Sequence, residues 1–184
     1  MSTALRLVFL FCMMCPFLWF MTAGSNTFTV PKLRDNGAVL GQISFLSGMA
    51  CVLAMGLFYV LWIPPAVCGV LLAVCSLALY EWSRRTVIDR NFYVGLSGEV
   101  PHAVCEAGPY RFVRHPFYLS YMVAFMAVAV AFPSFIVSGV CLINVGLFVY
   151  MTLDDEKVLL TSAIAADYAR YQSRVGMFLP RFST

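Results

Sequence analysis

Long apolar runs without a charged side chain constrain this sequence more than any other feature. The runs Leu7–Ala23, Ala38–Tyr80 and Phe117–Met151 contain no charged residue. A helix needs about 20 mainly apolar residues to cross the hydrocarbon core of a bilayer. Only 11% of the 184 residues are charged, which is too few to cover a water-facing surface. The sequence therefore predicts an all-α integral membrane protein.

Prolines and polar segments divide these runs into about five transmembrane helices arranged in hairpins. Pro64-Pro65 and Pro133-Ser134 are expected to form turns, because proline cannot donate the helical hydrogen bond. The expected spans are Leu7–Ala23, Ala38–Ile63, Ala66–Trp82, Phe117–Phe132 and Phe135–Met151. A secretory signal peptide is the competing interpretation of the first run, because Arg6 precedes it and small residues follow it. A retained span is favoured, since the rest of the chain is also apolar.

We expect one domain over residues 1–184, with three spans in 1–82 and the chemistry in 83–184. The loop 24–37, the loop 83–115 and the C-terminal tail carry nearly all basic residues, whereas the opposite side carries only Arg6. Basic residues concentrate on the cytoplasmic side of membrane proteins. The pattern predicts a cytoplasmic C-terminus and an N-terminus outside, with basic residues that face membrane lipids.

Two polar segments flank the second expected hairpin and would meet at one membrane face when the hairpin forms. The segment 102–118 supplies histidines, arginines and tyrosines, and the segment 154–171 supplies carboxylates and tyrosines. Leu153, Glu156, Leu160, Ile164, Tyr168 and Tyr171 recur at spacings of three or four, which predicts that they share one face of a C-terminal helix. Glu156 would be the only acid on that face, so it needs a bound ligand or an arginine from the other segment.

This combination of groups suits a zwitterionic ligand with an aromatic ring, such as S-adenosylmethionine. Arginine can bind a carboxylate through two hydrogen bonds, and tyrosine faces attract a sulfonium. Methyl transfer depends mainly on holding the nucleophile, the methyl carbon and the sulfur in line. The candidate catalytic residues are Arg111, Arg114, His115 and Glu156.

The motifs in these two segments resemble a known membrane enzyme family. GPYRFVRHPFYLSY, which begins at Gly108, resembles the GxYxxxRHPxY signature of the isoprenylcysteine carboxyl methyltransferase and phospholipid methyltransferase superfamily. DEKVLL resembles its EExxL element, with Asp155 in place of the first glutamate, and Tyr168, Tyr171 and Pro180 resemble its tail. The resemblance covers roughly residues 80–182.

The resemblance implies a site for S-adenosylmethionine between the loop 83–115 and the C-terminal helix, with a lipophilic acceptor that enters from the bilayer. The implied cofactor contacts are His102, Ala103, Val104, Cys105, Tyr110, His115, Pro116, Phe117, Tyr118 and Glu156. The acceptor atom could be a carboxylate oxygen, a thiolate sulfur or an amine nitrogen.

Three further positions depart from the pattern of the family. Isoprenylcysteine methyltransferases place an arginine four residues before the glutamate that Glu156 resembles, and here that position is Thr152, which disfavours a prenylated-protein substrate. Ser120 and Ala165 stand at positions where the family often has glycine. Both replacements are small, so the fold is expected to accommodate them.

Two other classes of function fit parts of the sequence. A sterol-reductase-like enzyme that binds NADPH resembles this family in its C-terminal region but is usually longer. A non-enzymatic membrane protein is the third possibility, although transport pathways usually need polar groups within the spans. Seven cysteines lie mostly in apolar runs, and Cys12 and Cys15 lack a second ligand pair, so we expect no metal site. The basic residues form no broad polar face, so nucleic-acid binding is not expected.

Overall fold

The computed structural model describes residues 3–27, 35–58, 62–88 and 103–181, and within these ranges the chain is helical without a named strand. Its elements are α1 (Thr3–Thr27), α2 (Asp35–Phe58), α3 (Ile63–Ile88), the short 3-10 helix η2 (Gly108–Arg111), α4 (Pro116–Ala131), α5 (Phe135–Leu160) and α6 (Ala165–Arg174). Of these, α1, α2, α3 and α5 are long and apolar enough to cross a membrane. The prediction of an all-α integral membrane protein is confirmed.

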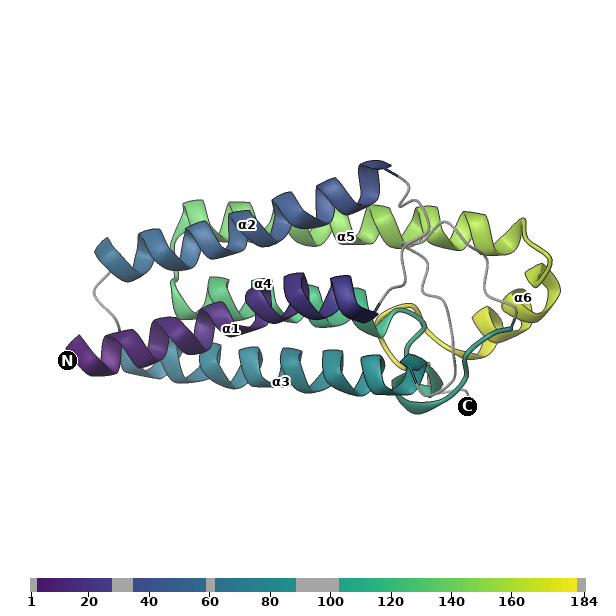
Figure 1. The fold of residues 1–184 in the computed structure, drawn as a ribbon, viewed down its shortest axis with the longest axis horizontal. Helices are drawn as coiled ribbons and strands as arrows, with labels where there is room; N and C mark the ends of the chain where they lie inside the picture. Colours follow the sequence, from purple (N-terminus) through teal and green to yellow (C-terminus); the bar gives the residue numbers. More distant parts are fainter. Residues whose placement is uncertain (1–2, 28–34, 59–61, 89–102, 182–184) are drawn as a thin grey trace.

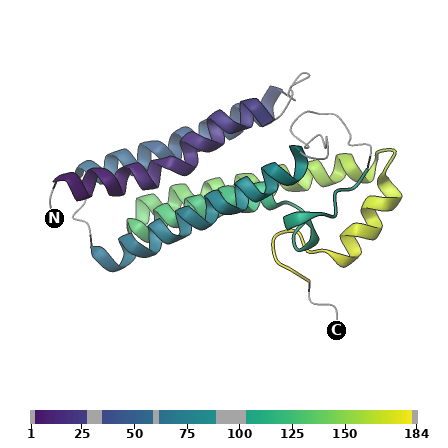
Figure 2. The same ribbon diagram turned by 60° about the horizontal axis from the view of Figure 1, so that its bottom comes forward.

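The helices α1 to α5 run side by side along the long axis of the molecule, and α6 lies beyond them at one end (Figure 1). A second view shows α1 and α2 as a pair beside the group formed by α3, α4 and α5 (Figure 2). The N-terminus lies at the end of the bundle opposite α6 (Figure 1). The polar C-terminal elements are therefore gathered at one end of an apolar bundle.

Helix α4 is the short helix of the bundle and its most buried part. Its 16 residues correspond to about 24 Å, less than the hydrocarbon core of about 30 Å. It packs closely against α3, where Gly69 faces Ala127 and Ala131 and the Ser76 hydroxyl donates a hydrogen bond to the Ser120 carbonyl at 2.7 Å. The predicted span Phe117–Phe132 thus forms an apolar helix enclosed by its neighbours rather than a full-length span of its own.

Aromatic side chains from the five helices of the bundle, α1 to α5, fill the core beside the polar end. The Tyr121 ring on α4 lies 4.9 Å from Phe20, 5.0 Å from Phe45 and 5.4 Å from Phe148, measured between ring centroids. Tyr80 on α3 lies 5.2 Å from Phe117 at the start of α4. These tilted and edge-on ring pairs fix the depth and rotation of α4, and with it the segment that precedes α4.

The first correction concerns the expected loop 83–115. Helix α3 does not end at Trp82 but continues to Ile88, so the polar segment begins inside a helix. The extension is stabilised by Glu81, which accepts hydrogen bonds from Arg84 at 2.7 Å and from Arg85 at 2.9 Å. Charges three and four residues apart are neighbours on a helix surface, so this polar sequence is compatible with continued helix.

The second correction concerns the C-terminal helix. Helix α5 runs past Met151 to Leu160, and a turn separates it from α6, so the expected single helical face is wrong. Leu153 and Leu160 are exposed, whereas Glu156 and Tyr168 are buried. The hydroxyl of Ser162 bonds to the Leu159 carbonyl at 2.7 Å, and side-chain hydroxyls that bond to nearby backbone compete with helix continuation.

The contact between α3 and α4 generates a test of the packing. A methyl group at Gly69 would lie 2.6 Å from the Ala131 Cβ and 2.9 Å from the Ala127 carbonyl oxygen. Gly69→Ala should therefore cost about 1–3 kcal/mol through overpacking and lower the melting temperature in detergent. Gly146→Ala on α5 is the matched control, because nothing lies within 4 Å of its added methyl group. Equal melting temperatures for the two variants would contradict this account of the packing.

Candidate active site

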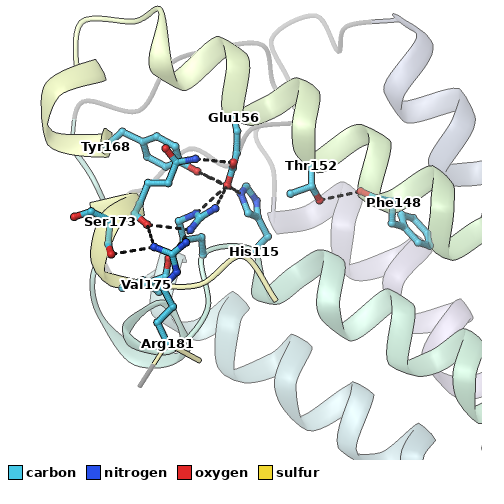
Figure 3. Close-up of polar contacts among 10 residues, drawn as sticks. His115, Phe148, Thr152, Glu156, Tyr168, Ser173, Val175 and Arg181 are labelled. Carbon is cyan, nitrogen blue, oxygen red and sulfur yellow. Dashed lines mark hydrogen bonds and ion pairs between the residues drawn. The ribbon is translucent and has the colours of Figure 1, made fainter. Parts of the chain in front are cut away.

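Three segments that are distant in the sequence converge at the polar end of the bundle. The residues just before α4 contribute Arg114 and His115, the last turns of α5 contribute Glu156, and α6 contributes Tyr168 (Figure 3). The turn between α4 and α5 makes these helices antiparallel, so the start of α4 and the end of α5 lie at the same end of the bundle. The expected meeting of the two polar segments is therefore present.

Glu156 is the centre of this cluster. Its Oε1 accepts a hydrogen bond from Arg114 Nε at 2.8 Å and lies 2.7 Å from Arg114 Nη2, 3.0 Å from His115 Nε2 and 3.2 Å from the Tyr168 hydroxyl. Its Oε2 accepts a hydrogen bond from Gln172 Nε2 at 2.9 Å. The Glu156 side chain is only 7% exposed, and a buried carboxylate requires such partners. The arginine expected to meet this acid is Arg114.

Arg114 is held by backbone as well as by Glu156. Its side chain is 5% exposed, and its Nη1 donates to the backbone carbonyls of Gln172, at 3.3 Å, and of Val175. The planar guanidinium can serve a carboxylate and carbonyl groups at the same time because its donors point in several directions. Arg114 therefore connects the end of α5 to the end of α6.

The chain after α6 returns to the segment before α4 and aligns with it. The Arg114 amide donates to the Gly176 carbonyl at 2.9 Å, and the His115 amide donates to the Met177 carbonyl at 3.3 Å, around an isolated parallel bridge between Val113 and Gly176. A Cβ at Gly176 would overlap the Leu179 carbonyl oxygen, so only glycine fits there. The tail thus holds the backbone that carries Arg114 and His115.

The two tyrosines of α6 have separate roles. Burial, reinforced by the charge of Glu156, raises the pKa of the Tyr168 hydroxyl, so the hydroxyl keeps its proton and donates to Glu156. The Tyr171 hydroxyl donates to the Tyr110 carbonyl at 2.6 Å and fixes the end of η2. Val104 packs against the small apolar cluster that Tyr168 and Tyr171 form with Val175.

Tyr118 lies on the first turn of α4 and forms a second contact with α5. Its hydroxyl donates to Asp155 Oδ2 at 2.8 Å, and its ring lies 6.1 Å from the His115 ring. Pro116 and Phe117 are buried at the start of the same helix. Of the two neighbouring acids, Asp155 therefore binds Tyr118, whereas Glu156 binds Arg114 and His115.

Other residues named from the sequence lie outside this network. Arg111 is exposed, and the described part of the chain gives it neither a hydrogen bond nor an ion pair. Ala103 is exposed and Cys105 is partly buried. His102 lies outside the described residues. The cofactor contacts expected from the resemblance at these positions stay predictions.

Sequence reasoning missed two kinds of partner of the cluster, one side chain of α6 and several backbone carbonyls. Gln172 was not expected, although it lies four residues after Tyr168 and so on the same face of α6. The backbone carbonyls of residues 175–177 could not be identified from the sequence, because every residue type has one. Thr152 is fully buried, and its hydroxyl donates to the Phe148 carbonyl at 2.8 Å (Figure 3). Among the described residues, no group of three His, Cys, Asp or Glu side chains is placed to hold a metal ion.

The buried ion pair gives a stability prediction. Arg114→Gln should lower stability by about 3–5 kcal/mol, because it leaves the Glu156 carboxylate buried without its cation. Arg174→Gln is the control, since Arg174 pairs with Glu106 at 3.0 Å but the two side chains are 57% and 45% exposed. An exposed pair is worth about 1 kcal/mol or less. The check is thermal unfolding in one detergent.

A double variant separates the pair from its surroundings. Arg114→Gln combined with Glu156→Gln removes both charges, so it should recover part of the loss seen in Arg114→Gln alone. Strictly additive losses would show that the pairing of the two charges does not determine the stability of this end of the bundle.

Part of this cluster lies in a region that matches a known protein family. The phospholipid methyltransferase family matches residues 64–164, more than half of the chain, from the first turn of α3 through α5. Comparison with curated proteins gives no match, and neither does comparison with solved structures. The matched region contains Arg114, His115 and Glu156. On this match and on its membrane-spanning helices, the chain belongs to the phospholipid methyltransferase family, a family of membrane methyltransferases.

Proposed function

We propose that this protein transfers a methyl group from S-adenosylmethionine to a lipophilic acceptor that reaches the site from the bilayer. The observation that carries the proposal is the buried cluster around Glu156, located where apolar helices of a methyltransferase family end. A membrane enzyme that works on lipophiles needs a polar site next to apolar helices, and this cluster has that location.

The side chains around the cluster suit the chemical groups of S-adenosylmethionine. Arg111 is an exposed cation that could bind a carboxylate, and Asp154 and Asp155 on α5 could accept from an ammonium or a ribose hydroxyl. The partly buried ring of Tyr110 offers aromatic surface to a sulfonium. When bound, the cofactor supplies an activated methyl group, and the task left to the protein is positioning.

The position of Thr152 supports an acceptor that is not held through a carboxylate. Thr152 is fully buried and its hydroxyl is used by the Phe148 carbonyl, so this turn of α5 provides no cation to a substrate. A carboxylate acceptor would need another partner, since a charge taken out of water must be paired. The lack of a cation at Thr152 favours a phospholipid-like or other small lipophilic acceptor over a prenylated cysteine carboxylate.

We further propose that the polar end faces the cytoplasm and the N-terminus lies outside. Basic residues gather at the polar end, on the end of α3, before α4, on α6 and in the tail, whereas Arg6 lies near the opposite end. This is the asymmetry that the positive-inside rule describes. It would give the site access to a soluble cofactor from the cytoplasm.

Calorimetric titration of the detergent-purified protein with S-adenosylhomocysteine tests the proposal, with NADPH as the comparison ligand. We expect saturable binding of S-adenosylhomocysteine and none of NADPH. Binding of NADPH alone would favour a sterol-reductase-like enzyme. Binding of neither ligand by folded protein would favour a non-enzymatic membrane protein.

Glu156→Gln tests the location of the site in the same titration. It should weaken S-adenosylhomocysteine binding about tenfold or more, because Arg114 and His115 lose the charge that positions them. Arg174→Gln, which alters an exposed pair, should bind like the unmodified protein. Unchanged binding by Glu156→Gln would mean that the cofactor site lies elsewhere.

A further inference from the structure

His115 is the member of the buried cluster whose ring is not fully used by its protein partners. We propose that Nδ1 of His115 accepts a proton from the methyl acceptor, and that the acceptor therefore arrives with a proton on its nucleophilic atom, as an ammonium or a thiol does. This inference rests on the proposed methyltransferase function. It assigns a role to one ring nitrogen and narrows the class of acceptor.

The tautomer of His115 follows from its contact with Glu156. His115 Nε2 lies 3.0 Å from Glu156 Oε1, and the same oxygen is paired with the Arg114 guanidinium at 2.7 Å. The Tyr168 hydroxyl also lies 3.3 Å from Nε2, but it donates its hydrogen to Glu156 Oε1 at 3.2 Å. An ionised carboxylate only accepts hydrogen bonds, so we assign the hydrogen of His115 to Nε2. A neutral imidazole has one N–H and one lone pair, which places the lone pair of His115 on Nδ1.

Glu156 itself is poorly suited to accept that proton. Its Oε1 faces Arg114, His115 and the Tyr168 hydroxyl, and its Oε2 accepts from Gln172 at 2.9 Å. Protonation of either oxygen would displace one of these donors and leave the buried Arg114 cation without its counter-charge. Glu156 is therefore a positioning residue, which sets the tautomer and the orientation of His115.

Nδ1 of His115 has no such partner. His115 caps the start of α4, yet its side chain makes no capping hydrogen bond, and within residues 103–181 and the described helices the structure gives Nδ1 no hydrogen bond. The ring lies 6.4 Å from Phe178 in the tail and 6.1 Å from Tyr118 on α4, between centroids. The imidazole is 10% exposed, so a small part of it is accessible at the surface of the cluster.

The charged groups next to His115 are already paired with one another. Arg114 in the preceding segment and Glu156 on α5 balance each other, Tyr168 on α6 is neutral, and Tyr118 on α4 is bound to Asp155 on α5. Phe178 from the tail carries no charge. A proton taken up at Nδ1 would lie on a ring whose Nε2 is 3.0 Å from Glu156 Oε1. Histidine is the side chain suited to exchange a proton near neutral pH.

The proposed step balances in atoms and electrons. His115 Nδ1 takes the proton from the acceptor nitrogen or sulfur, and the electron pair of that N–H or S–H bond stays on the nucleophile. The nucleophile then forms a bond to the methyl carbon while the carbon–sulfur bond breaks and its electrons remain on the sulfur of the cofactor. His115 releases its proton to water afterwards. An acceptor that is already ionised, such as a carboxylate, would not need this step.

Two measurements on the full-length protein in detergent test the inference. The first is ¹⁵N NMR of histidine-labelled protein, which distinguishes the two tautomers without any acceptor. The chain has two histidines, so the signal of His115 is the one that disappears in His115→Gln. We expect the tautomer with hydrogen on Nε2. A hydrogen on Nδ1 would overturn the proposal, because that atom could then not accept a proton.

The second measurement uses dodecylamine, dodecanethiol and dodecanoate as acceptor probes with labelled S-adenosylmethionine. The Gln side chain in His115→Gln can keep an N–H towards Glu156 but has no basic nitrogen. We expect turnover of the amine or the thiol, with a rate about 10²–10³-fold lower in His115→Gln at neutral pH. The deficit should shrink at high pH, where thiols and then amines lose their proton unaided.

The outcomes separate the inference from the proposed function. The affinity of His115→Gln for S-adenosylhomocysteine is measured in the same titration, and turnover is compared at saturating S-adenosylmethionine, so that weaker binding is not counted as lost proton transfer. Turnover of dodecanoate alone, or a rate deficit that is equal at all pH values, would overturn the role of His115 and leave the methyltransferase function in place. Failure of the unmodified protein to bind S-adenosylhomocysteine would instead refute the proposed function.

Discussion

The pairing of Glu156 with Arg114 is the interaction on which the polar end of this protein depends. Neither side chain could be buried alone, because each would retain an uncompensated charge. Their contact joins the end of α5 to the segment before α4, and Arg114 extends the connection to the backbone after α6. Residues from three parts of the chain are thereby fixed relative to one another at the end of an apolar bundle.

The bundle provides the rigid support that this pairing requires. α4 is enclosed by its neighbours, with a close approach at Gly69 and aromatic contacts around Tyr121. A helix that cannot rotate presents its first turn in a single orientation, so His115 and Tyr118 meet α5 in a defined register. The apolar packing of α4 therefore determines where its polar side chains lie relative to α5.

The sequence predicted the helices and the convergence of the two polar segments, because charge-free runs and a proline-broken hairpin are strong signals. It also identified Arg114, His115 and Glu156, which the structure brings together. The predicted helix ends were wrong where side-chain hydrogen bonds stabilise a different end. Glu81 accepts hydrogen bonds from arginines of the next turn, which extends α3, and the Ser162 hydroxyl bonds to the Leu159 carbonyl where the chain turns before α6. The sequence did not identify Gln172 as a partner of Glu156. It could not identify the carbonyls around Gly176, because every residue type has the same backbone carbonyl.

The chain after α6 holds Arg114 and His115 mainly through main-chain carbonyls of residues 175–177. Every residue type presents the same carbonyl, so substitutions at Val175 and Met177 can alter side-chain packing without removing these acceptors. Gly176 is the exception, because its Cβ position is occupied by the Leu179 carbonyl oxygen. Substitutions at Val175 and Met177 should therefore be tolerated better than a substitution at Gly176, which would displace the backbone that holds Arg114.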